Sequence, residues 1–322
     1  MKVAAWFSYT QGRWITSRDL ALFALLLLLP WGLKAVGSYT ALGTYILVWG
    51  LAAMGLNLLI GYAGRVSFGH AAFLGLGAYT AGLMLKHATH DTLLATLAAL
   101  PVGALAALVL GNLVVRLKGI YFATFTIVFS QLFYFVAFQW NELTGGDDGL
   151  RGFARQGLGP PGLHLDLNAS EAYYYFVWAV FVLSVLALRW IVTSPLGRSF
   201  LALRENPIRA RFLGMNVERR LLVAFALSAS FTALAGALLA QLINFAQPSM
   251  LHWTTSGELV MMAFLGGRWA FYGPLLGAAL FRIMEEVLSS RTENWMLFLG
   301  ILFILAVLFF PRGIAGFLGR RE

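Results

Sequence analysis

Cysteine is absent from this 322-residue chain. Disulfide bonds and thiolate metal sites are therefore excluded, and cysteine usage says nothing about the redox compartment. The sequence also lacks the G-x-x-x-x-G-K-[ST] phosphate loop, the H-E-x-x-H zinc motif and the G-x-S-x-G nucleophile elbow. We therefore expect no catalytic residue, no metal and no cofactor in this chain, and no ATP hydrolysis by a phosphate-loop mechanism.

Charged residues are scarce, at 11% of the chain, against about a quarter in soluble domains. Hydrophobic residues make up 60%, and the mean hydropathy is +0.77. A helix needs about 20 apolar residues to cross the hydrocarbon layer. The pattern predicts an all-α polytopic membrane protein with about ten hydrophobic segments, at 19–36, 41–60, 68–85, 92–115, 119–139, 172–193, 221–243, 249–267, 272–288 and 295–311.

Acidic residues are outnumbered by basic ones, 14 to 23, so the formal net charge is +9. Lys and Arg concentrate in the cytoplasmic loops of membrane proteins. With ten crossings from a cytoplasmic N-terminus, 17 basic residues fall on the cytoplasmic side, five fall outside and Arg282 lies within a helix. This bias predicts cytoplasmic N- and C-termini, and it accounts for the charge without a nucleic-acid partner. The run from Leu20 to Leu33 lacks a small-residue cleavage site, so we interpret it as a retained helix.

Two hydrophilic stretches interrupt the apolar pattern, an outer loop at about 140–171 and a cytoplasmic loop at about 194–220. No second soluble domain is evident, so we expect a single transmembrane domain over 1–322. Segment 249–267 contains a polar run from Trp253 to Glu258, which predicts a broken or re-entrant helix. Such breaks are tolerated only inside protein or beside a water-filled cavity.

The cytoplasmic loop contains the stretch NPIRARFLG, which is typical of a short capped helix. Asn206 is a favoured N-cap residue, Pro207 suits the first helical position, and Gly214 suits the position after the last turn. Ile208 and Phe212 are four residues apart and share a face. Two interpretations fit this basic and apolar helix: it lies on anionic lipid, or it docks into a soluble partner.

Polar residues and glycines inside the apolar segments are candidates for a translocation pathway, because intramembrane charges are costly. Glu258 has no evident local partner. Arg282 precedes Glu285 and Glu286 by three and four residues, which favours a salt bridge on one helix face. His70 is either a packing residue or a pathway residue, and the glycines before it form either a turn or a discontinuous element. The pathway candidates are Asn57, Gly61, Gly64, Ser67, Phe68, Gly69, His70, Glu258, Gly266 and Gly267.

Four motifs occur in order along the chain. They are GLNLLIGYAGRVSFGHAAFLGLGAYTAG at 55–82, TGGDDGL at 144–150, SPLGRSFLALRENPIRARFLGMNV at 194–217 and FLGGRWAFYGPLLGA at 264–278. Together they resemble the permease subunits of binding-protein-dependent ABC importers, most closely the LivM-type permeases of the branched-chain amino acid family. The last motif departs from the family pattern, because Trp269 stands where glycine is usual and Ala270 where threonine is usual.

The resemblance implies that 1–322 is a permease domain that forms the translocation pathway for branched-chain amino acids or a related small solute. It implies a homologous second permease subunit, two cytoplasmic ATPase subunits that hold ATP and Mg, and an extracytoplasmic solute-binding protein. It also implies a multi-pass location in the bacterial cytoplasmic (inner) membrane, in contact with membrane lipid. The implied ATPase-coupling helix comprises Arg204, Glu205, Asn206, Pro207, Ile208, Arg209, Ala210, Arg211, Phe212 and Gly214.

The outer-loop motif contains paired aspartates between glycines. A hard cation needs six or more oxygen ligands, so a turn with outward-facing carboxylates is favoured over a cation site. We expect this turn to meet basic groups of the binding protein. The docking candidates are Thr144, Gly145, Gly146, Asp147 and Asp148.

Two alternatives remain open. A secondary transporter or channel that acts alone would need its own coupling-ion site or selectivity filter, and neither is evident. Systems with similar permeases also move urea, short amides or aromatic acids, so the substrate is open as well. A membrane enzyme is disfavoured because no catalytic constellation is present.

Overall fold

The computed structural model describes residues 16–35, 37–89, 91–155, 157, 166–310 and 313–318. The chain ends and part of the outer loop lie outside this range. The predicted cytoplasmic position of the two termini therefore concerns residues that are not described.

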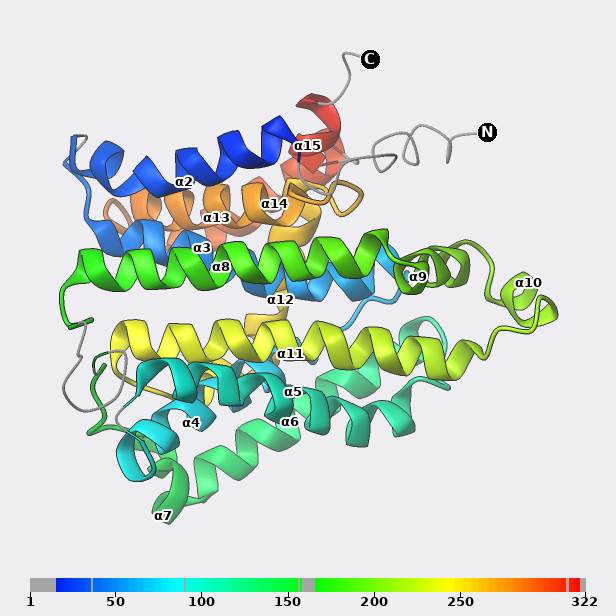
Figure 1. The fold of residues 1–322 in the computed structure, drawn as a ribbon, viewed down its shortest axis with the longest axis horizontal. Coiled ribbons are helices and arrows are strands. Elements are labelled where there is room, and N and C mark those ends of the chain that lie inside the picture. The colour runs from blue at the N-terminus through cyan, green and yellow to red at the C-terminus, as the bar shows by residue number, and fades with distance from the viewer. Residues whose placement is uncertain are drawn as a thin grey trace.

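The described part of the chain is helical throughout its apolar segments (Figure 1). Each of the ten predicted segments contains one helix of 14 residues or more. These helices are α2 (Ser17–Ala35), α3 (Thr40–Asn57), α4 (His70–His87), α5 (Thr92–Val114), α6 (Ile120–Gln139), α8 (Ser170–Thr193), α11 (Val217–Ile243), α12 (Trp253–Gly266), α13 (Gly273–Ser289) and α14 (Trp295–Phe309).

Shorter elements lie between them or extend them. They are the π-helical turn η1 (Leu58–Tyr62), α7 (Asn141–Thr144), the 3₁₀ turn η2 (Gly146–Asp148), α9 (Pro195–Glu205), α10 (Pro207–Phe212), the 3₁₀ turn η3 (Pro248–Leu251) and α15 (Gly313–Leu318). The prediction of an all-α protein is therefore confirmed for the described residues, and their apolar helices are compatible with a polytopic membrane protein. Within the described part of the chain, five helices are long and apolar enough to span a membrane: Thr40–Tyr62, Thr92–Val114, Ile120–Gln139, Ser170–Thr193 and Val217–Ile243.

The centre of the bundle is built from α3 and α11. In the most apolar window of Thr40–Tyr62, 94% of the residues are buried inside the protein, against 22% for α6 at the periphery. Helix α11 packs against α3, α4 and α5. In the contact between α11 and α4 the two backbones touch. A Cβ added to Gly77 would lie 1.8 Å from the carbonyl oxygen of Ala233, and a Cβ added to Gly236 would lie 1.8 Å from the carbonyl oxygen of Leu74. Small residues let the two helix backbones approach this closely. In lipid, where no hydrophobic effect drives helices together, such close packing is a main source of helix association.

The segment predicted to be broken is interrupted, but not at its polar run. The interruption is η3 and His252, before α12 begins at Trp253, whereas the polar run from Trp253 to Glu258 is itself helical as the first part of α12. At about 1.5 Å per residue, the 14 residues of α12 extend about 21 Å, less than the roughly 30 Å of the hydrocarbon core. Gly266 and Gly277 bring α12 and α13 into close backbone contact.

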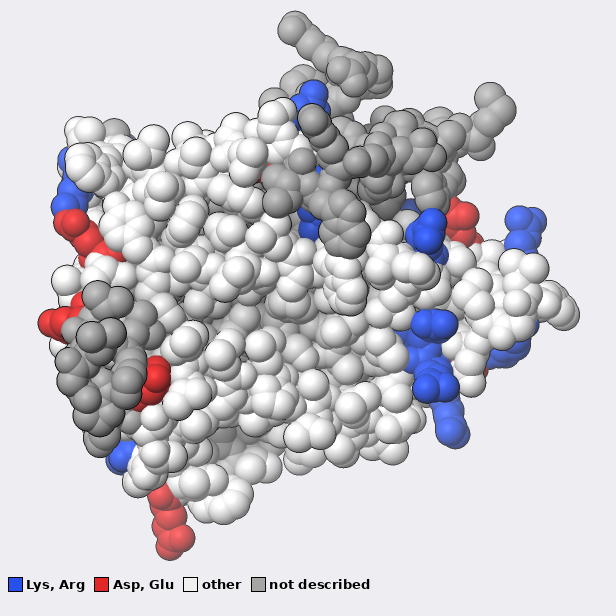
Figure 2. Space-filling model, in the orientation of Figure 1, with Lys and Arg blue, Asp and Glu red and all other residues white. Residues whose placement is uncertain are grey.

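Charges gather at the two ends of the bundle (Figure 2). Exposed arginines surround the α9–α10 end, at Arg198, Arg209, Arg211, Arg219 and Arg220. Exposed acidic residues lie at the opposite end, at Glu142, Asp147, Asp148, Asp166 and Glu171. The band between these ends is almost uncharged on the face shown in Figure 2, as expected for a surface in contact with hydrocarbon.

Candidate functional site

Helix α10 is a short helix capped at both ends, as predicted. The Asn206 side chain accepts hydrogen bonds from the backbone N–H groups of Ile208 and Arg209, both at 3.0 Å. At the other end Gly214 adopts φ +81°, and its N–H donates to the Arg211 carbonyl at 3.0 Å. The next N–H, of Met215, donates to the Ala210 carbonyl at 3.1 Å. These bonds satisfy backbone groups that a six-residue helix would otherwise leave unpaired.

The outer surface of α10 combines apolar and basic side chains. Phe212 is 87% exposed, Leu213 80% and Ile208 64%, whereas Ala210 is buried and anchors the helix to the rest of the protein. Figure 1 shows α10 projecting beyond the ends of the long helices. Large exposed apolar side chains on a projecting basic element are typical of a surface that contacts a partner or a membrane.

A half-buried arginine connects this loop to the interior. The Arg204 side chain on α9 donates a hydrogen bond to the Gly61 carbonyl in η1, and its guanidinium lies 4.6 Å from the centre of the Trp269 ring. Arg268 lies 4.5 Å from the same ring. Burial lowers the pKa of both guanidinium groups. The α9–α10 loop is thereby joined to both glycine-containing breaks, at Gly61 and between α12 and α13.

The break after α3 is packed more tightly than an open pathway would be. His70 is fully buried, and its ring nitrogens contact the hydroxyl oxygens of Ser67 at 3.0 Å and Ser228 at 2.7 Å. Gly61 lies against Asn57, and Gly69 lies against the Thr126 backbone. In this conformation these candidates form a packed seam between helices, which agrees with the packing interpretation of His70.

The outer-loop motif forms the predicted turn. Thr144 is buried, and its hydroxyl donates to the carbonyls of Ala137 and Trp140, both at 2.6 Å. Asp147 and Asp148 in η2 are exposed. The two exposed carboxylates remain candidates for docking.

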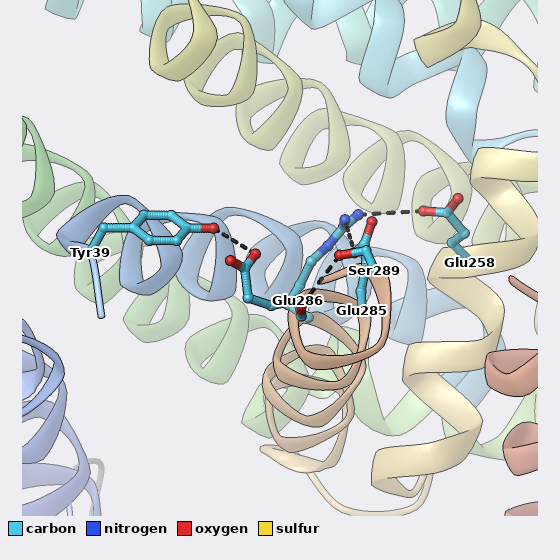
Figure 3. A network of polar contacts seen from close by, with 6 residues as sticks. Tyr39, Glu258, Glu285, Glu286 and Ser289 are labelled. Atoms are coloured by element: carbon cyan, nitrogen blue, oxygen red, sulfur yellow. Dashed lines mark hydrogen bonds and ion pairs between the residues drawn. The ribbon is translucent and has the colours of Figure 1, made fainter. Parts of the chain in front are cut away.

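Charged residues near the middle of α12 and α13 form a network that sequence spacing described only in part (Figure 3). Arg282 pairs with Glu285, as predicted. Glu286 does not join this pair; it accepts a hydrogen bond of 2.6 Å from the Tyr39 hydroxyl. Glu258 has a partner that is not local, because Arg282 Nη2 lies 3.4 Å from Glu258 Oε2. The partners are 24 residues apart on different helices, so local spacing could not reveal the contact.

The sequence family described as "Branched-chain amino acid transport system / permease component" matches residues 38–307. The chain belongs to this family. The high-affinity branched-chain amino acid transport system permease LivM of Escherichia coli (strain K12) is 30% identical over 321 residues, which cover 92% of this chain and 75% of the relative. The corresponding LivH permease of the same organism is 32% identical over 143 residues, or 44% and 46% of the two chains.

A permease from a different transport system also matches. The autoinducer 2 import system permease LsrC of Shigella flexneri is 31% identical over 274 residues, which cover 81% of this permease and 75% of the relative. No solved structure gives a significant match. Among the described residues of the permease, no group of three or more His, Asp or Glu side chains is arranged to hold a metal ion.

Sequence reasoning missed one buried ion pair of the permease. Asp19 on α2 is 2% exposed and pairs with Arg189 on α8. Tyr272, just before α13, donates to Asp19 at 2.8 Å, and the Thr16 hydroxyl donates at 2.7 Å. This network joins three elements at the end of the bundle that carries α9. The signal in the sequence was an aspartate next to an apolar run, but its partners lie too far along the chain to be inferred.

Proposed function

We propose that the chain is a membrane-embedded permease subunit of an ABC importer for branched-chain amino acids. Two cytoplasmic ATPase subunits would bind ATP and Mg, an extracytoplasmic binding protein would deliver the solute, and a homologous second permease would complete the pathway. The match to relatives named LivM and LivH, which are permeases of one kind of transport system in the same organism, supports the pairing of two permeases.

The observation that carries the proposal is the capped, projecting helix α10. A permease without an ATPase of its own needs a rigid contact through which a soluble motor can move it. A six-residue helix held at both ends by hydrogen bonds, with Phe212 and Leu213 exposed, provides such a contact. Arg204 then supplies a route inward, because displacement of α9 pulls on Gly61 and on the Trp269 ring.

The test is ATP-driven leucine uptake by the complete transporter in proteoliposomes, comparing wild type with Arg209→Glu. Arg209 is exposed on α10, so the substitution leaves the interior intact while reversing a charge on the contact surface. We expect uptake to be abolished with normal expression. Uptake at the wild-type rate would favour a helix that merely lies on lipid. Concentrative uptake by the chain alone, without nucleotide or partners, would overturn the proposal in favour of a secondary transporter.

A further inference from the structure

The Arg282 network lies deep within the bundle. Its guanidinium carbon is 3.9 Å from the centre of the ring of Trp49, which lies near the middle of the span Thr40–Tyr62. The side chain of Arg282 is 12% exposed, and those of Glu258 and Glu285 are 33% and 25% exposed. The cation is therefore covered by protein, while both carboxylates are partly exposed.

Partly exposed carboxylates are unsuited to direct contact with lipid hydrocarbon. Charged side chains within membrane segments face other protein or a water-filled cavity. Glu258 shares its face of α12 with Thr254, one turn before it, and with Met261, three residues after it. The face is thus polar at one end and apolar at the other. In Figure 3 the Glu258 side chain points from α12 toward the α13 residues.

The contacts of Arg282 are incomplete. Its Nη1 pairs closely with Glu285, but the contact of Nη2 with Glu258 is long, at 3.4 Å. Among the described residues, the Nε–H of Arg282 has no hydrogen-bond partner, and neither does the indole N–H of Trp49, which is 6% exposed. Buried donors without acceptors are rare and costly. Two buried donors and one long ion pair therefore lie together here, and they suit an added anionic hydrogen-bond acceptor.

We infer that Glu258 and Arg282 form a subsite for the head group of a zwitterionic α-amino acid in the translocation pathway. The substrate carboxylate replaces Glu258 beside Arg282, and the substrate ammonium pairs with the released Glu258 carboxylate. One ion pair opens and two form, so no charge is left unpaired within the membrane. Met261, three residues after Glu258 on the same face of α12, would contact the apolar side chain of the substrate.

This exchange selects among the substrate classes that the sequence left open. Urea carries no charge and cannot compensate either member of the pair. Benzoate can pair with Arg282 but leaves Glu258 unpaired, and an unpaired buried charge is strongly unfavourable. The subsite therefore deepens the proposed function, on which it rests, by explaining why the solute should carry both charges.

The test uses the complete transporter in proteoliposomes with its binding protein, and it measures leucine uptake and ATP hydrolysis separately. For Glu258→Gln we expect uptake to fall roughly tenfold or more, as when one member of a desolvated charge pair is removed, while ATP hydrolysis stimulated by the binding protein persists. The matched control is Glu286→Gln on α13, which removes a carboxylate paired with Tyr39 and should leave uptake unchanged.

A second measurement covers the case in which the Glu258→Gln complex does not assemble. The chain has no cysteine, and a Cβ added at Gly257 meets no atom within 4 Å. Gly257→Cys therefore introduces a reporter beside Glu258 for a cationic methanethiosulfonate reagent. In the complete complex without binding protein, millimolar leucine should slow modification severalfold, whereas urea and benzoate should not.

The outcomes separate the two proposals. Wild-type leucine uptake with an equally active Glu258→Gln variant would overturn the subsite and leave the proposed function standing. Equal protection of Gly257→Cys by leucine, urea and benzoate, or protection by none of them, would also overturn the subsite. A wild-type transporter that does not take up leucine would overturn both.

Discussion

Gly214 ends the helix that we assign to ATPase coupling, and Gly214→Val tests that assignment through the backbone alone. Gly214 has φ +81°, and a Cβ at this position meets nothing within 4 Å. The substitution therefore adds no steric clash, only the cost of holding an L-residue in the left-handed region. That cost is roughly 1–2 kcal/mol, which shifts the ratio of ordered to disordered helix about five- to thirtyfold.

The assay is leucine uptake by the complete transporter, with expression and assembly measured in parallel. We expect Gly214→Val to lower ATP-driven uptake severalfold while the amount of assembled complex stays normal, because α10 projects from the bundle. Gly37 provides a matched control. It has φ +76° and open surroundings, and it ends α2 with the same pair of hydrogen bonds, from Gly37 to Lys34 and from Ser38 to Leu33.

Gly37→Val should carry the same backbone cost at a site away from α10, so we expect uptake to remain near the wild-type level. Equal losses in the two variants would mean that strain destabilises the whole protein, and the coupling argument would fail. Full uptake by Gly214→Val would likewise refute it.

Three further predictions concern other parts of the molecule. Combined Asp147→Asn and Asp148→Asn substitutions should weaken the binding protein's affinity for the reconstituted transporter at low salt; unchanged affinity would exclude docking through these carboxylates. Trp269→Gly removes the cation–π contacts of the Trp269 ring with Arg204 and Arg268, each worth about 0.5–1 kcal/mol or more. If these contacts couple the loop to the pathway, the substitution should raise the amount of ATP hydrolysed per leucine imported, and an unchanged ratio would exclude this role. Asp19→Ala should lower the unfolding free energy in detergent by about 3–5 kcal/mol by leaving Arg189 unpaired. As a control, Lys34→Ala breaks an exposed pair and should lower the unfolding free energy by about 1 kcal/mol or less. Similar losses in the two variants would contradict the burial argument.

The sequence by itself determined the helical membrane architecture and the local form of the coupling loop. Long apolar runs have one stable solution in lipid, so each predicted segment from 19–36 to 295–311 contains a helix. The caps of α10 depend on Asn206, Pro207 and Gly214 acting on residues within a turn of themselves. Only the presence of an interruption in segment 249–267 could be predicted; its position could not, because the polar residues from Trp253 to Glu258 are helical and the break lies before them.

The tertiary structure alone decided which distant polar groups meet. Arg282 has possible partners on its own helix, and only the packing of α12 against α13 brings Glu258 to it. The packing of α9 on η1 likewise places Arg204 against Gly61, 143 residues away, and the packing of α2 on α8 places Asp19 against Arg189. Helical periodicity describes contacts over three or four residues, whereas these contacts depend on how whole helices cross, a property that is encoded in close-packed small residues rather than in the charged residues themselves.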